Sequence, residues 1–223
     1  MLIARPSRVP GRTGPRLYDL ANMIRLLVAR HGQSEWNAVG RWQGRANPPL
    51  SEIGMAQARA AATTVGAVDA VIASPLERAL VTATVISESI GVGPVMVEPG
   101  LQERHAGEFQ GLTRAEIDQQ FPGYLESGRR PPGWEPDDEV TDRALGALDS
   151  VSEMMGDNSA PADILAIAHA GIIYSLEAHF GEAFVRIDNL NGRWFIHDTG
   201  GWSLGERMSL IPDGVVITES ESL

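Results

Sequence analysis

The sequence predicts an α/β fold with three layers, in which a doubly wound, mostly parallel sheet carries helices on both faces. Short apolar segments of strand length alternate along the chain with longer segments that have helical periodicity. Glycine, proline and serine residues stand between these segments, where strands and helices are expected to begin and end. Of the 223 residues, 43% are hydrophobic, which is sufficient for the core of one domain.

The first predicted strand and helix have clear ends. The segment "MIRLLVAR" (23–30) is short, mostly apolar and bounded by Gly32, which is typical of a buried strand. Residues 51–66 have the composition of a helix that begins after Ser51, a residue suited to the N-cap position. Gly66 is expected to end this helix.

A second strand and helix follow, and then a third strand. "VDAVIAS" (68–74) predicts another buried strand, and residues 75–91 predict a helix. Pro75 is expected in the first turn of this helix, where proline is permitted, and Gly91 at its end. "VMVEPG" (95–100) predicts a short third strand.

The second half of the chain continues the alternation and ends in a hairpin. Acidic residues favour a helix start near position 137, because they complement the helix dipole. The predicted elements are helices over 113–121 and 137–156, a strand over 162–171, a helix over 172–181, and a hairpin over 192–214 with its turn at 198–201.

We expect one domain over residues 23–223, preceded by an extension. Residues 1–22 contain four arginines, three prolines and no sustained apolar period, so we interpret them as a disordered basic extension before a natural start at Met23. The proline-rich segment 128–138 is interpreted as a surface insertion and not as a linker between domains.

The composition excludes several classes of function. The formal net charge of −11 and a pI of about 4.9 argue against general affinity for nucleic acid or anionic membranes. No apolar run approaches the ~20 residues that span a bilayer, so we expect a cytoplasmic protein. We expect it to be either a monomer or a homodimer. There is no cysteine, and all 18 basic residues are arginine, which excludes thiolate nucleophiles and lysine-dependent phosphate sites.

Arginine and histidine side chains follow two predicted strands and begin one helix. Arg30 and His31 end the first strand, His169 ends the fourth, and Arg78 lies one turn into the helix after the second. Because the carboxyl ends of parallel strands share one edge of the sheet, where such folds bind ligands, we expect a functional site there. The remaining histidines, which we interpret as structural, are His105, His179 and His197.

These motifs, with others in the same order, resemble those of the histidine phosphatase superfamily, also called the phosphoglycerate mutase-like family. "RHGQSEWN" (30–37) matches the Arg-His-Gly signature of this family, and the similarity extends over about residues 23–212. An ordered set of motifs is far more specific than the tripeptide alone. The other matching segments are "QG" (43–44), "NPPLSEIGMAQA" (47–58), "SPLERALVTA" (74–83), "LQERHAGEFQGLT" (101–113) and "IAHAG" (167–171).

The resemblance implies a phosphomonoesterase that hydrolyses a small phosphorylated metabolite through a phosphohistidine. His31 would be the nucleophile, with its other ring nitrogen donating to a backbone carbonyl. Glu103 would be the general acid and then the base toward water. Arg30 and Arg78 would hold the phosphoryl oxygens, and His169 would add a donor when protonated. The implied substrate-binding residues are Gly32, Asn37, Gln43, Gly44, Arg114 and Ala170.

Ala170 departs from the family pattern, which usually has glycine there. Because the backbone amide is kept, we expect a changed rim and not a lost activity. No metal and no cofactor are implied, since the arginines supply the positive charge that a metal would bring.

Two alternatives remain open. A cofactor-dependent phosphoglycerate mutase is one, because Arg129 and Arg130 could correspond to the paired arginines that mutases place over the substrate, although Ala106 lacks the expected hydroxyl. The other is a binding module for phosphorylated ligands without catalysis, against which the retained histidines, arginines and Glu103 argue. The aromatic residues that we expect around the mouth of the pocket are Trp36, Trp42, Phe109, Trp134 and Tyr174.

Overall fold

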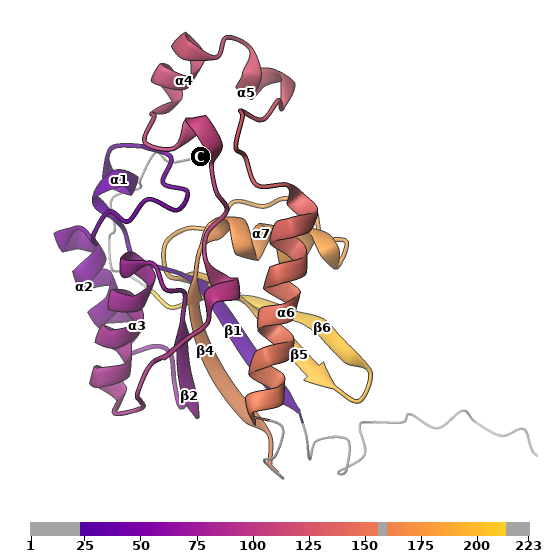
Figure 1. Ribbon diagram of the computed structural model, residues 1–223. Helices are drawn as coiled ribbons and strands as arrows, with labels where there is room; N and C mark the ends of the chain where they lie inside the picture. Colours follow the sequence, from indigo (N-terminus) through magenta and orange to yellow (C-terminus); the bar gives the residue numbers. More distant parts are fainter. Residues whose placement is uncertain (1–22, 156–159, 213–223) are drawn as a thin grey trace, which may run out of the picture.

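The computed structural model describes residues 23–155 and 160–212, which contain a six-stranded sheet with helices on both faces (Figure 1). The extension predicted over residues 1–22 lies outside the described residues. The order of the strands is β3-β2-β4-β1-β5-β6. They are β1 (Ile24–Arg30), β2 (Ala70–Ala73), β3 (Met96–Val97), β4 (Ala162–Ala168), β5 (Asn191–Asp198) and β6 (Gly201–Ser209).

The sheet is mostly parallel, as predicted. Strands β1, β4, β2 and β3 are parallel neighbours, whereas β5 runs antiparallel to β1 and β6 antiparallel to β5. In the β1–β4 pair, Arg30 is aligned with Ala168. The residues that follow these two positions, His31 and His169, therefore leave the sheet side by side.

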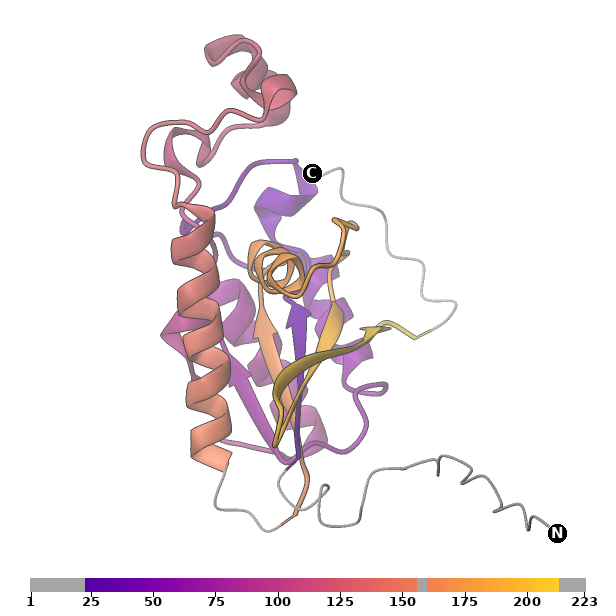
Figure 2. The same ribbon diagram turned by 90° about the vertical axis from the view of Figure 1, so that its right-hand side faces the viewer.

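Two pairs of helices cover the sheet and complete the three layers. Helices α2 (Glu52–Ala61) and α3 (Glu77–Ile90) lie on one face, and α6 (Asp137–Met155) and α7 (Ala170–His179) lie on the other (Figures 1 and 2). This arrangement confirms the predicted doubly wound architecture.

Both faces of β1 are buried at residues 26–29, which explains the apolar run "LLVA" in its centre. Leu26 and Val28 pack into the core that contains the α6 and α7 side chains, whereas Leu27 and Ala29 pack into the core beneath α2 and α3. Successive side chains of a strand point to opposite faces, so a continuous apolar run marks a strand covered on both sides. This double burial holds the end of β1, and with it Arg30 and His31, in the middle of the sheet edge.

The predicted helix boundaries are confirmed in part. The Ser51 hydroxyl accepts a hydrogen bond from the Gly54 amide at 3.0 Å and so caps α2, and Gly91 ends α3 in the left-handed conformation at φ +70°. Helix α2 ends before position 66, however, because residues 62–65 form turns in which the Thr63 hydroxyl bonds the Ala60 carbonyl.

Further boundaries differ from the prediction. Strand β4 ends at Ala168 and α7 begins at Ala170, so the last two residues of the predicted strand are helical. Helix α3 begins at Glu77 with Leu76 as its N-cap, so Pro75 precedes the helix and does not occupy its first turn. The Ser74 hydroxyl stabilises the chain before the helix by accepting a hydrogen bond from the Leu76 amide at 3.3 Å. Strand β3 has only two residues, because it lies at the edge of the sheet and pairs with β2 alone.

Short helices form a cap beyond the carboxyl edge of the sheet, seen at the top of Figure 1. Its centre is Phe109, which is fully buried although we expected it at the mouth of the pocket. Its ring contacts four other aromatic rings at centroid distances of 5.3 to 6.3 Å. The short helices are α1 (Glu35–Ala38), α4 (Arg114–Gln120) and α5 (Tyr124–Ser127), with the 3-10 turn η2 (Gly107–Phe109). The 3-10 turn η1 (Pro99–Leu101) packs instead against α6, with Leu101 in the core beneath α6 and α7.

Segment 128–138 runs from this cap to α6, and most of its residues are exposed, whereas Pro131 and Glu135 are buried. In the part of the chain that the structure describes, no helix has the length and apolar character needed to cross a membrane.

Candidate active site

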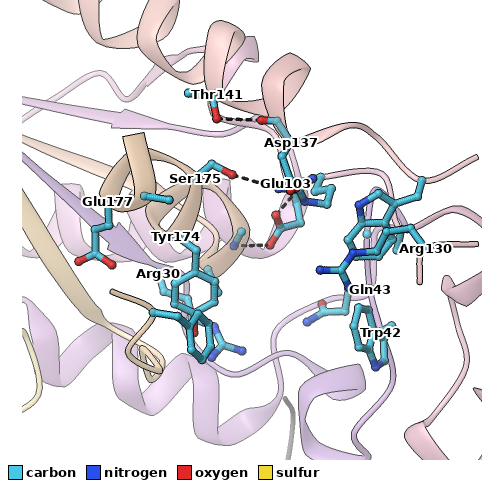
Figure 3. Close-up of a pocket in the computed structure, with 18 of the residues that line it drawn as sticks. Arg30, Trp42, Gln43, Glu103, Arg130, Asp137, Thr141, Tyr174, Ser175 and Glu177 are labelled. Carbon is cyan, nitrogen blue, oxygen red and sulfur yellow. Dashed lines mark hydrogen bonds and ion pairs between the residues drawn. The ribbon is translucent and has the colours of Figure 1, made fainter. Parts of the chain in front are cut away.

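A cavity of about 660 Å³ opens at the carboxyl edge of the sheet. Tyr174 and Glu177 of α7 lie on one side, and Trp42, Gln43 and Arg130 lie on the other (Figure 3). The end of β1, the start of α3 and the cap all contribute to its lining. The cavity therefore lies where the sequence predicted a site.

His31 is held rigidly, with an exposed fraction of 2%. Its Nδ1 lies 2.6 Å from the carbonyl oxygen of Gly32. A carbonyl only accepts hydrogen bonds, so Nδ1 carries the proton and Nε2 keeps its lone pair. The backbone carbonyl of His31 also accepts from the Asn189 amide group at 2.7 Å. The predicted contact to a backbone carbonyl is thus present, and it leaves Nε2 with a free electron pair.

Arg78 is fully buried beside His31. Its Nε donates to Nε2 of His31 at 3.1 Å, while its two terminal nitrogens donate to the carbonyls of Ala46 at 2.8 Å and Gly44 at 3.0 Å. Burial lowers the pKa of Arg78 to about 10, so the guanidinium stays charged at neutral pH. Neutral carbonyls hold it in place without cancelling its charge.

Arg30 is held in a similar way. It is 8% exposed, and its Nη1 donates to the carbonyl of Ile187 at 2.9 Å. Burial lowers its pKa. Within residues 23–155 and 160–212, neither Arg30 nor Arg78 forms an ion pair with a carboxylate. Two positive charges that lack a carboxylate partner therefore lie at the floor of the cavity, where an anion would be stabilised.

His169 packs beside His31 and is fully buried. The two ring centroids are 5.2 Å apart with an angle of 60° between the ring planes. The Nε2 of His169 lies 2.7 Å from the Ser74 hydroxyl, and its Nδ1 has no hydrogen-bond partner among the described residues. Unlike His31, His169 is not among the residues that line the cavity.

Both imidazoles are neutral in this environment. Burial, followed by the positive charge of Arg78, lowers the pKa values of His31 and His169 well below the ordinary 6.5. For His31 this agrees with its expected part as a neutral nucleophile. For His169, burial next to two guanidiniums opposes a third positive charge, so the donor that we expect from a protonated His169 stays a prediction.

Glu103 brings a carboxylate to the same cavity. Its Oε2 accepts from the Gly171 amide at 3.2 Å, and its Oε1 accepts from the Arg104 amide at 2.7 Å. Gly171 lies in the first turn of α7, where the helix dipole favours a negative charge. A Cβ atom on Gly171 would lie 2.3 Å from Oε1 of Glu103, so the contact depends on glycine at this position.

Most of the predicted substrate-binding residues line the cavity. Gly32 is the exception, since its amide donates to the Thr82 hydroxyl at 3.1 Å and a Cβ there would lie 2.7 Å from the Gly54 carbonyl oxygen. Close packing against α2 therefore explains this glycine. The predicted residues that do line the cavity are Asn37, Gln43, Gly44, Arg114 and Ala170.

The mouth differs in part from the prediction. Trp42, Trp134 and Tyr174 line the cavity as expected, but Trp36 does not. Arg129 does not line it either, because its guanidinium lies over the Tyr124 ring at 4.0 Å.

Sequence reasoning missed Asn189, Arg104 and Phe184. Asn189 lies just before the hairpin predicted over 192–214, and its side chain donates to the His31 carbonyl. Arg104 and Phe184 also line the cavity. Arg104 follows Glu103 in the matching segment "LQERHAGEFQGLT", so its neighbour was the available signal, whereas Phe184 lies outside the matching segments. Across residues 23–155 and 160–212, no group of three or more His, Cys, Asp or Glu side chains could hold a metal ion.

Comparisons with known proteins agree with this geometry. The model of the histidine phosphatase superfamily (branch 1) matches residues 26–206. A glucosyl-3-phosphoglycerate phosphatase of Mycolicibacterium vanbaalenii is 35% identical over 69% of this chain and 72% of its own length. A metal-independent phosphoserine phosphatase of Arabidopsis thaliana is 30% identical over 73% of this chain and 71% of its own length.

The solved structures give the same result for the fold. The native structure of a mycobacterial glucosyl-3-phosphoglycerate phosphatase superposes with a TM-score of 0.70 at 28% identity, covering 82% of this chain and 97% of that one. The match over residues 26–206 includes the end of β1, the start of α3 and the start of α7, which together form the site. The chain belongs to branch 1 of the histidine phosphatase superfamily.

Proposed function

We propose that this phosphatase hydrolyses small phosphomonoesters through a phosphohistidine formed on Nε2 of His31. The observation that carries the proposal is the contact between a neutral imidazole, whose tautomer is fixed by Gly32, and the buried guanidinium of Arg78. A nucleophile with a free electron pair thus lies next to a preformed positive charge. Phosphoryl transfer needs this combination, because its catalysis consists mostly of positioning and of stabilising charge on the phosphoryl oxygens.

In the first step, Nε2 of His31 attacks phosphorus while the bond from phosphorus to the substrate's alcohol oxygen breaks. Attack requires the 3.1 Å hydrogen bond from Arg78 Nε to be exchanged for one to a phosphoryl oxygen. Arg30 contributes a second guanidinium. Glu103, in its protonated form, gives its proton to the leaving oxygen, so that an alcohol departs.

In the second step, a water oxygen attacks phosphorus while the bond from phosphorus to His31 Nε2 breaks. Glu103 is now a carboxylate and takes the water's proton, which returns it to its initial state. Inorganic phosphate leaves, and His31 regains its lone pair. A phosphoryl dianion next to His169 would favour its protonated form, so the donor expected from the sequence belongs to the substrate-bound enzyme.

The cavity supports a substrate larger than a bare phosphate group. Its volume of about 660 Å³ lies within the range typical of small-molecule sites. Arg114 and Arg130 at the mouth favour a substrate that carries a second anionic group. We further propose that residues 23–223 act as one catalytic domain in a monomer or homodimer located in the cytoplasm.

The mutase alternative gains no support from the mouth. Arg129 and Arg130 could correspond to the paired arginines that mutases place over the substrate, but only Arg130 lines the cavity. Retention of His31, Arg78 and Glu103 in one cavity equally argues against a module that only binds ligands.

The deciding experiment measures phosphate release from p-nitrophenyl phosphate with and without a chelator, followed by a panel of phosphorylated metabolites. We expect hydrolysis that resists the chelator. Interconversion of 3- and 2-phosphoglycerate, stimulated by the bisphosphate, would instead establish the mutase. Binding of phosphorylated ligands without turnover would establish the binding module.

A further inference from the structure

Glu135 is a buried carboxylate outside the cavity. It lies between Trp134 of the cap and the start of α6, it is 9% exposed, and it is not among the residues that line the cavity. A buried acid is costly unless it is paired and hydrogen-bonded. Its partners therefore indicate what this carboxylate does.

Each of the two carboxylate oxygens of Glu135 accepts two hydrogen bonds. Oε1 accepts from Arg45 Nη2 at 2.9 Å and from Arg143 Nε at 2.8 Å. Oε2 accepts from the His105 amide at 2.9 Å and from Arg143 Nη2 at 3.0 Å. Burial raises the pKa of this carboxyl, but the hydrogen bonds from Arg143 and from the His105 amide more than offset the rise, so the pKa lies below its ordinary value. Glu135 is therefore charged at neutral pH.

These partners enclose the segment that carries Glu103. Arg143, which Glu135 orients, donates from Nη1 to the carbonyls of Gly100 and Gln102 on one side of Glu103. On the other side, the Glu135 carboxylate accepts from the His105 amide, and the Glu135 amide donates to the His105 carbonyl at 3.0 Å.

Arg45 extends the same network to the phosphate-binding side of the site. Its Nε donates to the Glu103 carbonyl at 3.3 Å, while its Nη2 binds Glu135. The carbonyls of its two neighbours, Gly44 and Ala46, hold the guanidinium of Arg78. One buried carboxylate thus links the backbone around Glu103 to the loop that fixes Arg78.

We propose that Glu135 is a positioning residue that sets the Glu103 carboxyl relative to the phosphoryl site, and so controls proton transfer to the leaving oxygen. This inference rests on the proposed function, in which Glu103 gives that proton. It predicts that loss of Glu135 selectively slows substrates whose leaving group must be protonated.

The test compares kcat/KM for 2,4-dinitrophenyl phosphate, whose leaving group departs without a proton, with kcat/KM for phenyl phosphate, whose leaving group needs one. Because kcat/KM covers only the steps up to the departure of the phenol, the second role of Glu103 does not enter. The ratio of the two values in one preparation is also independent of the fraction of folded enzyme. The variants are Glu103→Gln, Glu135→Gln and, as a matched control, Glu116→Gln.

Glu116 is a suitable control because it is also a cap carboxylate paired with an arginine. It accepts from Arg41 Nη1 at 2.7 Å and from the Thr113 amide at 2.7 Å, and it does not line the cavity. Its loss removes a similar ion pair without touching the segment around Glu103.

We expect Glu135→Gln to lower kcat/KM for phenyl phosphate by about 10- to 100-fold and that for the dinitrophenyl ester by less than about threefold. Glu103→Gln should show the same selectivity with a larger loss, and Glu116→Gln should keep the parental ratio. If Glu135→Gln lowers kcat/KM equally for both substrates, or for neither, the inference is overturned. The proposed function still stands in that case, provided that Glu103→Gln lowers kcat/KM more for phenyl phosphate than for the dinitrophenyl ester. If Glu103→Gln is itself unselective, the proposed acid is wrong and the inference fails with it.

A second variant keeps the test decisive if Glu135→Gln does not fold. Arg45→Ala removes the contacts to Glu135 and to the Glu103 carbonyl, and the Arg45 side chain is 37% exposed, so its loss leaves the core intact. We expect a selective loss of about three- to tenfold on phenyl phosphate. An unchanged substrate ratio in Arg45→Ala would overturn the inference.

Discussion

The floor and the mouth of the cavity both present arginines, but they hold them differently. At the floor, Arg30 and Arg78 are buried and bonded to backbone carbonyls. At the mouth, the Arg114 side chain is 55% exposed beside Asp118, and Arg130 lies over the Trp134 ring at 4.6 Å. Floor arginines are buried and poorly screened, whereas mouth arginines are exposed and screened by water and salt.

This difference separates the reaction from the choice of substrate. Preformed charges in a dry site stabilise a transition state at little reorganisation cost, so the floor determines the chemistry. Exposed charges change binding by small amounts, so the mouth adjusts which phosphomonoester binds. The following predictions test this separation, beginning with the floor.

Loss of the proposed nucleophile, His31, should have the largest effect. His31→Ala is expected to lower kcat on p-nitrophenyl phosphate by about 10⁴- to 10⁶-fold, because the covalent step is removed. His197→Ala is the control, since its ring packs against Trp202 on the terminal hairpin. Turnover by His31→Ala at the parental rate would refute the mechanism. Retention of phosphate by the parental enzyme after an alkaline quench, absent from His31→Ala, would identify the phosphohistidine.

The planar guanidinium of Arg78, with its several donors, should contribute to catalysis in addition to its positive charge. Arg78→Lys keeps a positive charge but cannot bond His31, Gly44 and Ala46 together, so kcat/KM should fall by about 10²- to 10³-fold. Arg59→Lys, at an exposed position of α2, is the matched control. A loss of less than about tenfold in Arg78→Lys would show that charge alone is sufficient at the floor.

The buried imidazoles should make stability depend on pH. Because the folded pKa values of His31 and His169 are lowered below 6.5, the unfolded chain binds more protons below that pH. The free energy of unfolding should therefore fall by up to about 2.7 kcal/mol between about pH 7.5 and pH 5.5, or about 1.4 kcal/mol for each imidazole. Urea unfolding across this range measures the effect. His31→Ala should remove half of it, and an identical pH dependence in that variant would contradict the assignment.

Glycine at position 171, at the start of α7, should be required for the correct placement of the Glu103 carboxylate. Gly171→Ala would place a methyl group 2.3 Å from Oε1 of Glu103, and the flexible carboxylate would turn away while the fold remains. We expect kcat/KM for phenyl phosphate to fall by about 10- to 100-fold with little change in Tm. Gly146→Ala is the control, because a Cβ at that helical position meets open space. Full activity in Gly171→Ala would show that the Gly171 contact does not position Glu103.

The floor was largely predictable from the sequence. An apolar run marks a strand buried on both faces, and parallel strands bring their carboxyl ends to one edge, so Arg30, His31 and His169 were placed before any contact was known. The depth of His169 was not predictable, because nothing in "IAHAG" distinguishes a side chain lining the cavity from one behind it.

The mouth and the cap were much less predictable. Their short helices pack through aromatic rings and ion pairs between distant segments, such as Arg45 with Glu135 and Trp42 with Phe109. Periodicity reports which face of a long helix or strand is buried, but it says nothing about packing between loops. Phe109 was therefore placed at the mouth although it is the centre of the cap.

The smallest predicted effect belongs to the mouth, where neighbouring arginines provide their own control. Arg130 lines the cavity and Arg129 does not, yet both guanidiniums lie over an aromatic ring of the cap. Arg130→Met should raise KM by about two- to fivefold for phosphoserine or 3-phosphoglycerate, because each has a second anionic group, and leave p-nitrophenyl phosphate unchanged. Added salt should reduce the difference between the parental enzyme and Arg130→Met, since exposed charges are screened. Arg129→Met should leave all three KM values unchanged, and an equal effect of both variants would mean that the cap, and not the charge facing the cavity, selects the substrate.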